Sequence, residues 1–168
     1  LSSIWACNNP KSSTNMATAT IQDSSTLKIS LAEWSFHKAL FDKKMDHLGF
    51  IAKAGAMGFS GVEYVNQFFA DKASDTSYLN KMTAASKKAG VAQLLIMVDG
   101  EGYLADMDKT KRDSAVTNHY KWVDAAAYLG CHSIRVNAHG EGSADEVAAA
   151  AIDGLSRLAT YAQTKNIN

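Results

Sequence analysis

Four times along this sequence, a short apolar run is followed by a longer segment whose apolar residues recur at helical spacing. The apolar runs cover residues 27–31, 61–65, 92–98 and 132–137. Strict alternation of strand and helix constrains the fold strongly, because the helices then act as right-handed crossovers between parallel strands. The sequence therefore predicts an α/β domain built on one parallel sheet.

Capping residues mark the ends of the expected helices. The predicted N-caps are, in chain order, Asp42 or Asp46, then Asp75, then Ser143, which forms a capping box with Glu146. Gly90 and Gly130 follow helical segments at the position where a left-handed glycine ends a helix. These signals divide the chain into four strand–helix units.

The number of these units bears on the architecture. Eight such units close into a TIM barrel of roughly 250 residues. Four units followed by the start of a fifth strand at residues 165–168 match its first half, and a complete four-stranded α/β domain is the alternative. The sequence has no GxGxxG after its first strand and no GxxxxGKS/T motif, which argues against a nucleotide-binding doubly wound sheet. We predict a (β/α)8 TIM barrel of which this chain, over residues 27–168, holds the first four βα units.

Residues 1–26 differ in composition from the rest of the chain. They are rich in Asn, Ser, Thr and Ala and offer few side chains for a core. Ile4-Trp5-Ala6-Cys7 resembles a bacterial lipobox, in which a small residue precedes a cysteine that becomes lipidated. We predict a signal-peptide remnant with Cys7 as the lipidation site and a disordered tether after it; the alternative is a disordered tail with an incidental cysteine. Lipidation implies a location in the bacterial cell envelope, and its absence a cytoplasmic one.

Charge and hydropathy argue against two classes of partner. Lys plus Arg and Asp plus Glu number 17 each, so the net charge is zero and the basic footprint of a nucleic-acid-binding protein is missing. No apolar run of this sequence reaches the roughly 18 residues that favour a membrane-spanning helix. We expect no nucleic-acid partner, and contact with a membrane only through a lipid on Cys7.

The fourth apolar run carries polar side chains on one face. Its two β-branched residues alternate with Ser133, Arg135 and Asn137. An unpaired buried charge is costly, so Arg135 needs a carboxylate partner. We expect Glu63, which points inward from the second run, to pair with Arg135; the alternative is that Glu63 holds a substrate hydroxyl.

Polar or aromatic residues follow all four strands at their carboxyl ends. In a β/α barrel these ends meet at one face, where the active site lies. The candidate substrate-binding residues are Trp34, His37, Glu63, Asp99, Glu101, Asn137 and His139, and Glu33, Asn66 and Glu141 hold similar positions. None of them completes a known catalytic constellation.

Simpler roles are open for several of these residues. Trp34 either stacks on a sugar-sized ligand or plugs the barrel mouth. The two acidic residues after the third strand either contact a ligand or solvate the start of a helix. His139 is either a ligand or base or a solvated loop residue, whereas His119 and His132 are predicted to be packing residues.

Four stretches of the sequence resemble the xylose isomerase-like TIM barrels, the sugar phosphate isomerase/epimerase superfamily. They are Lys28-Ile-Ser-Leu31, Gly58-Phe-Ser-Gly-Val-Glu63, Leu94-Leu-Ile-Met-Val-Asp99 and Ser133-Ile-Arg-Val-Asn137. The Gly-Phe-x-Gly-Val-Glu step into the second strand is the most specific of them. The resemblance covers residues 27–168, which match the first half of the family fold, and within the superfamily the chain looks most like secreted or lipid-anchored bacterial members.

This resemblance implies a metal-assisted reaction of a small-molecule sugar. Family members hold a divalent ion (Mn, Mg, Co or Zn) through acidic and His residues at the ends of strands five to eight. The resemblance therefore places the metal ligands and the catalytic carboxylates beyond Asn168. It implies no metal ligand within this chain. The implied reaction is isomerisation or epimerisation of a sugar or sugar phosphate by proton transfer next to a carbonyl, with this chain inactive on its own. The oligomeric state is left open, and an oligomer is possible.

Two other functions are weighed. The first is a non-catalytic surface lipoprotein that binds sugars or glycans, which the tail around Cys7 and the incomplete catalytic site motivate. The second is a metal hydrolase like the apurinic endonucleases of the same superfamily, because Val136-Asn-Ala-His-Gly140 resembles the surroundings of one of their His ligands. Two observations argue against the hydrolase. Asp99 stands where these enzymes are expected to have another His, and the net charge is zero.

Overall fold

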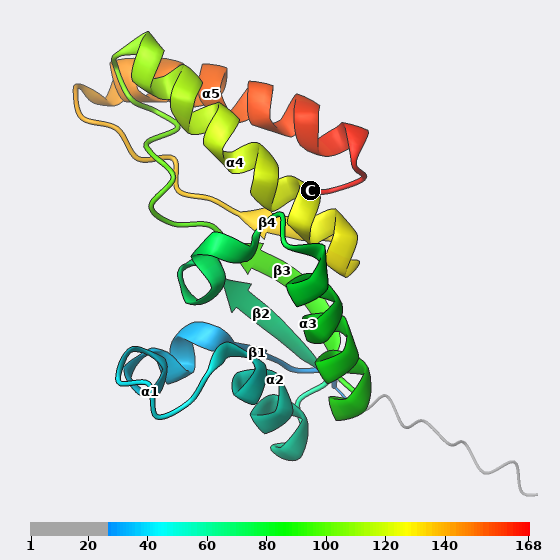
Figure 1. Cartoon of the computed structure of the whole chain (residues 1–168). Helices are drawn as coiled ribbons and strands as arrows, with labels where there is room; N and C mark the ends of the chain where they lie inside the picture. Colours follow the sequence, from blue (N-terminus) through cyan, green and yellow to red (C-terminus); the bar gives the residue numbers. More distant parts are fainter. Residues whose placement is uncertain (1–26) are drawn as a thin grey trace, which may run out of the picture.

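The computed structural model describes residues 27–168. Its four strands are β1 (Ser30–Ala32), β2 (Gly61–Val65), β3 (Ala92–Met97) and β4 (Ser133–Arg135). They lie side by side in chain order, and each neighbouring pair is parallel. Figure 1 shows the arrowheads of β2 and β3 pointing the same way. The predicted parallel sheet is confirmed, and the carboxyl ends of all four strands lie at one end of it.

Helices connect the strands in the predicted order. α2 (His47–Ala56) leads from β1 to β2, α3 (Thr76–Ala89) from β2 to β3, and α4 (Lys109–Leu129) from β3 to β4. α5 (Ala144–Thr164) follows β4 and runs alongside α4 (Figure 1). The carboxyl ends of β1 and β2 lead into the 3-10 segments η1 (Glu33–Phe36) and η2 (Asn66–Lys72), with the short helix α1 (His37–Phe41) after η1. The described chain matches the first four βα units of a TIM barrel.

The predicted helix caps are confirmed. Asp46, and not Asp42, caps α2, because its Oδ1 accepts the N–H of Gly49 at 2.6 Å. Asp75 caps α3 in the same way. Ser143 forms the expected capping box with Glu146 at the start of α5. The glycines that end α3 and α4 both adopt the left-handed conformation that favours glycine.

The core lies between the sheet and the helices. Its fully buried members include Phe50, Val62, Tyr64, Ile96 and Trp122. They come from α2, β2, β3 and α4, so both the sheet and the helices contribute to the core. Residues on the other face of β3 are only partly buried. The sheet therefore has one closed, helix-covered face and one face that in a barrel points inward.

Asn168 extends the sheet beyond β4. Its N–H donates to the carbonyl of His132 at 3.0 Å, and its carbonyl accepts the N–H of Ile134 at 2.9 Å. These two bonds are the pattern of a parallel ladder, in which one residue bridges two residues of its neighbour. The fifth-strand start predicted at residues 165–168 is thus placed next to β4.

Glu33 does not reach the barrel mouth. Its side chain is fully buried, its Oε1 lies 2.6 Å from Nδ1 of His47, and its Oε2 accepts the N–H of Val65 at 2.9 Å. The chain turns into η1 at this residue and carries the carboxylate back toward α2 and β2. Glu33 therefore joins three elements and has no oxygen left for a ligand.

Other expectations concern single residues. The packing role predicted for His132 is wrong, because its side chain is exposed at the start of β4. Cys131 is buried with a free thiol, and burial raises its pKa to about 12. Cys7, its lipidation and the tail of residues 1–26 lie outside the described residues. Within residues 27–168, no helix has both the length and the apolar character to cross a membrane.

Candidate functional site

A network of three polar side chains lies at the carboxyl ends of β3 and β4. Nη1 of Arg135 donates to Oδ1 of Asp99 and to the side-chain oxygen of Asn137, both at 3.0 Å. The amide of Asn137 donates to the same Asp99 oxygen at 2.6 Å. Charge-assisted bonds of this kind are stronger than neutral ones. The alternation of β4 sends Arg135 and Asn137 to the same face, as the sequence predicts.

The predicted pairing of Glu63 with Arg135 is wrong. Glu63 lies on β2 and Arg135 on β4, with β3 between them, so the two chains are about 10 Å apart across the sheet. Asp99 lies closer, because it follows Met97, the residue that pairs with Arg135 in the ladder. Glu63 instead accepts a hydrogen bond from the hydroxyl of Ser30 on β1 at 2.6 Å.

Asn66 fixes the backbone at Asp99. Its amide nitrogen donates to the Asp99 carbonyl at 2.9 Å, and its amide oxygen accepts the Asp99 N–H at 3.0 Å. Asn66 is buried at the start of η2, so it links the carboxyl ends of β2 and β3. Its role is to position Asp99 and it does not face a ligand.

Trp34 and His37 lie in an exposed aromatic cluster. Their rings stack with centroids 4.8 Å apart, and Nδ1 of His37 lies 2.7 Å from the Trp34 carbonyl. Phe41 and Phe68 pack against the indole, with ring centroids 6.1 and 6.3 Å from that of Trp34. Trp34 remains 45% exposed and Phe41 55% exposed. This aromatic cluster therefore presents a partly exposed aromatic surface beside β1.

Glu101 is held by α4. Its Oε1 accepts the indole N–H of Trp122 at 2.6 Å, and Nζ of Lys121 lies 2.9 Å from the same oxygen and 3.0 Å from the other. The carboxylate is thus engaged by the helix that follows it. Of the two roles open to Glu101, this geometry matches solvation of a helix better than ligand contact.

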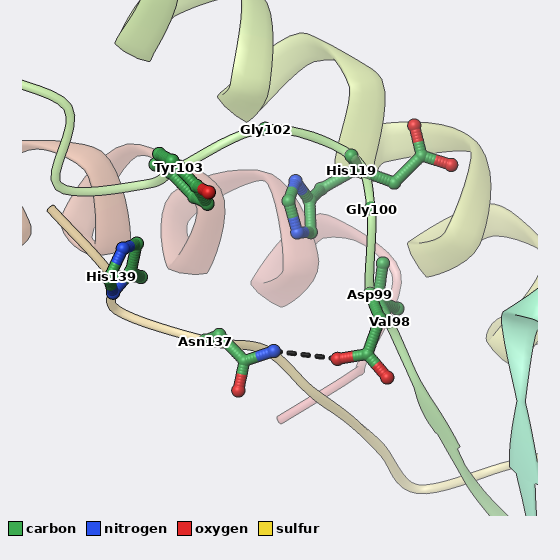
Figure 2. Close-up of a pocket in the computed structure, with 9 residues that line it drawn as sticks. Val98, Asp99, Gly100, Gly102, Tyr103, His119, Asn137 and His139 are labelled. Atoms are coloured by element: carbon green, nitrogen blue, oxygen red, sulfur yellow. Dashed lines mark hydrogen bonds between the residues drawn. The ribbon is translucent and has the colours of Figure 1, made fainter.

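His139 borders a cavity between the loops that follow β3 and β4. The ring of His139 meets the ring of Tyr103 edge to face at 4.4 Å. The carbonyl of His139 accepts the N–H of Ala105 at 3.1 Å, which joins the two loops. Figure 2 shows Tyr103, His139, Asn137 and Asp99 around this space.

The structure thus separates the seven candidate residues into three places. Trp34 and His37 lie beside β1, Glu63 on β2, and the rest around the cavity at the ends of β3 and β4. Sequence reasoning missed the ring partners Phe41 and Phe68, the cavity residue Tyr103 and the pairing of Arg135 with Asp99. Tyr103 directly follows Gly102 in a loop with a second glycine at position 100, which was the one available signal for it.

A divalent ion does not fit the described residues. Among residues 27–168, no three His, Cys, Asp or Glu side chains converge closely enough to hold a metal.

Comparison with known proteins agrees with the fold. The chain resembles D-psicose 3-epimerase with D-tagatose from Clostridium cellulolyticum H10 (TM-score 0.67, 14% identity, 84% of this chain and 50% of the other). It also resembles a sugar phosphate isomerase/epimerase from Parabacteroides distasonis ATCC 8503 (TM-score 0.63, 14% identity, 86% of this chain and 51% of the other). A third similar structure is the IolI protein with a bound zinc atom (TM-score 0.63, 12% identity, 84% of this chain and 50% of the other). The chain spans about half the length of each of them.

No curated protein sequence matches this chain. A family model does: the model of the xylose isomerase-like TIM barrel matches residues 51–168, which is well over half of the sequence. That match agrees with the four parallel βα units and with the resemblance of the strand sequences. The chain belongs to the xylose isomerase-like TIM barrel family.

Proposed function

We propose that this chain supplies substrate-binding walls for a sugar isomerase or epimerase that moves a proton next to a carbonyl. The observation that carries the proposal is the network of Arg135, Asp99 and Asn137 at the carboxyl ends of β3 and β4. In this fold that end of the barrel holds the active site. Solved proteins of the same fold are named as epimerases of sugars.

The network suits recognition of sugar oxygens. Of the three guanidinium nitrogens of Arg135, Nη1 alone donates to other described residues. Nε and Nη2 are therefore left to donate to a ligand. The Arg135 side chain is 42% exposed, which leaves its charge accessible from the inward face. Asp99, fixed by Asn66, keeps the guanidinium in place. Arg135 therefore orients a carbonyl, hydroxyl or phosphate oxygen of the substrate.

The aromatic cluster suits the apolar face of the sugar. Trp34 has one ring face covered by His37 and stays nearly half exposed. A sugar presents C–H groups on one face and hydroxyls at its rim, so an exposed ring and a polar network are complementary to it. We assign Trp34 to stacking and Arg135, Asp99 and Asn137 to the polar contacts.

The catalytic part of the proposal is tested by isotope exchange. The protein is expressed from its complete coding sequence, loaded with Mn²⁺, Mg²⁺, Co²⁺ or Zn²⁺, and incubated in D₂O with D-fructose, D-tagatose and their phosphates. Proton NMR is expected to show loss of the C–H signal next to the carbonyl as deuterium replaces that hydrogen. If no sugar of the panel exchanges or changes configuration with any of the metals, the catalytic function is refuted.

A matched pair of variants tests the binding role. R135M removes the guanidinium from the network and is expected to lower kcat/KM by at least tenfold. R157M removes an arginine of similar exposure, which pairs with Asp113 and Asp153 on the outer helices, and should leave kcat/KM unchanged. Equal effects of the two variants would remove Arg135 from the site.

A sugar-binding protein without catalysis is the second candidate. The observation that favours it is the exposure of the aromatic cluster, since such surfaces also bind glycans without turnover. Together with it we propose that Cys7 carries a lipid that anchors the protein in the cell envelope. Saturable sugar binding that W34A abolishes, without isotope exchange, would establish this function. Mass spectrometry of the mature protein, with C7S as the control, tests the lipid.

A further inference from the structure

The cavity between the loops after β3 and β4 contains a histidine that no role above uses. The cavity has a volume of about 310 Å³, at the lower end of the range for small-molecule pockets. His119 of α4 lines it together with Asp99, Glu101, Tyr103, Asn137 and His139. In Figure 2 the imidazole of His119 projects into the space that Tyr103, His139, Asn137 and Asp99 surround. We call this space the His119 cavity.

The hydrogen bonds of His119 set its tautomer. Nδ1 lies 2.7 Å from the carbonyl of Ala115, one turn earlier in α4. A carbonyl only accepts, so Nδ1 must carry the proton and Nε2 must hold a lone pair in the neutral ring. Burial lowers the pKa of His119, which favours that neutral form. The residue is 2% exposed, and Nε2 has no hydrogen-bond partner among residues 27–168.

The side chains around His119 offer acceptors. Oδ1 of Asp99 is engaged by Arg135 and Asn137, whereas its Oδ2 accepts no hydrogen bond from the described residues. The Tyr103 side chain is exposed, and its hydroxyl makes no bond in the same part of the chain. No Lys or Arg lines the cavity. The lining thus offers the lone pair of His119 and the carboxylates of Asp99 and Glu101, with which Arg135 and Lys121 pair from outside the cavity. These acceptors favour a ligand with O–H donors.

The loop after β3 is built to approach α4 closely. Gly102 has a φ of +96°, and a Cβ there would lie 2.9 Å from the Cβ of Ala115. A larger residue at this position would push the loop away from the helix. The close approach brings Tyr103 and His119 to the same small space.

We propose that the His119 cavity is a subsite for an uncharged, hydroxyl-bearing end of a sugar or polyol, whose O–H donates to Nε2 of His119. Asp99 Oδ2 accepts a second hydroxyl, and Tyr103 closes the outer side. The proposal rests on the proposed function for the identity of the ligand as a sugar. It goes further by assigning the direction of the hydrogen bond and by requiring an O–H donor, and not an anionic oxygen, at Nε2 of His119.

The test is a titration followed by nitrogen NMR of the histidine side chains in the full chain. D-fructose is the probe, and inorganic phosphate is the anionic comparison. Forming an O–H···Nε2 bond is expected to shift the ¹⁵Nε2 resonance of His119 saturably with D-fructose and not with phosphate. An unmoved His119 signal, or a shift with phosphate alone, would overturn the proposal.

Two variants separate the hydrogen bond from the fold. H119N keeps a donor for the Ala115 carbonyl but has no acceptor at the Nε2 position, so the Kd for D-fructose should rise about tenfold, the equivalent of one lost hydrogen bond. H119Q places an amide oxygen near the Nε2 position and should restore part of the affinity. Equal affinity of H119N and wild type contradicts the subsite, and the wild-type titration decides the question if a variant does not fold.

The same titration distinguishes the subsite from the wider function. A shift at the Trp34 indole nitrogen without one at His119 refutes the subsite and leaves the proposed sugar site in place. A shift at His119 in a protein that fails the isotope-exchange test retains the subsite and refutes the isomerase function. If D-fructose shifts neither signal, the subsite proposal is refuted.

Discussion

Replacement of Glu33 tests the packing beneath the barrel mouth. Its carboxylate is fully buried and holds two donors that nothing else in the described chain satisfies, Nδ1 of His47 at 2.6 Å and the Val65 N–H at 2.9 Å. His47 is 4% exposed, and its Nε2 has no hydrogen-bond partner among the described residues. The imidazole therefore depends on Glu33 for its one hydrogen bond.

The geometry sets the magnitude of the loss. E33A leaves the His47 ring and the Val65 N–H unsatisfied, and each such buried group costs about 1–3 kcal/mol. The two groups together set the expected cost of E33A at about 2–6 kcal/mol. E33Q keeps an oxygen for Val65 and an amide donor for His47, whose ring can change tautomer to accept it. We expect E33Q to cost only about 1 kcal/mol.

Urea denaturation of the wild type and both variants, followed by circular dichroism, measures these free energies. The expected order of stability is wild type, then E33Q, then E33A. A double-mutant cycle with H47A should show a coupling energy of at least about 1 kcal/mol between the two side chains. A cost below about 1 kcal/mol for E33A, or equal costs for E33A and E33Q, would refute the role of Glu33 as a buried link.

The remaining predictions concern pH, reactivity, capping and binding. Burial lowers the pKa of His119, so the unfolded state takes up the proton first and stability falls as the pH drops below about 6.5; urea midpoints against pH should show this slope in wild type and not in H119N. In a C7S background the Cys131 thiol, with its pKa raised to about 12, should react with Ellman's reagent only after unfolding. S143A should cost about 1 kcal/mol by urea denaturation, because it removes the cap of α5. R135M should keep the free energy of unfolding, measured in urea, within about 0.5 kcal/mol of wild type while D-fructose binding weakens, since the Arg135 side chain is partly exposed.

The order of the elements could be predicted because each signal is local. Gly90 and Gly130 end helices by the left-handed conformation that glycine tolerates, and Ser143 and Glu146 satisfy the first N–H groups of a helix from within four residues. The strands follow from the short apolar runs between these boundaries. Once strand and helix alternate, the parallel sheet has few alternatives.

The partner of Arg135 could not be predicted in the same way. That a carboxylate must face the guanidinium follows from the cost of an unpaired charge, but the choice between Glu63 and Asp99 depends on sheet order and register. Asp99 lies two residues beyond Met97, the ladder partner of Arg135, and Asn66 holds its backbone there. Contacts between loops of this kind have no periodic signal.

His119 shows a different limit. It lies among apolar neighbours on the buried face of α4, and the structure confirms that it is buried. The sequence does not reveal that the loop after β3 leaves a cavity over this one turn of the helix. That outcome depends on the conformation of Gly102, whose lack of a Cβ lets the loop come close to Ala115. A packing residue and a cavity-lining residue therefore have the same sequence pattern.

Under the proposed function, the four strand ends divide substrate binding between two walls, the aromatic cluster and the network of Arg135, Asp99 and Asn137. β2 lies between the aromatic cluster beside β1 and the network of β3 and β4, and both walls are tied to it. On one side Glu33 accepts the N–H of Val65, and on the other Asn66 holds the backbone of Asp99. Because Val65 and Asn66 are consecutive residues, the distance between the two walls is set by one short, buried stretch of chain. If a substrate contacts both walls, as the proposed function requires, we expect it to be selected by its length, because a shift of either wall breaks the hydrogen bonds of Glu33 or Asn66.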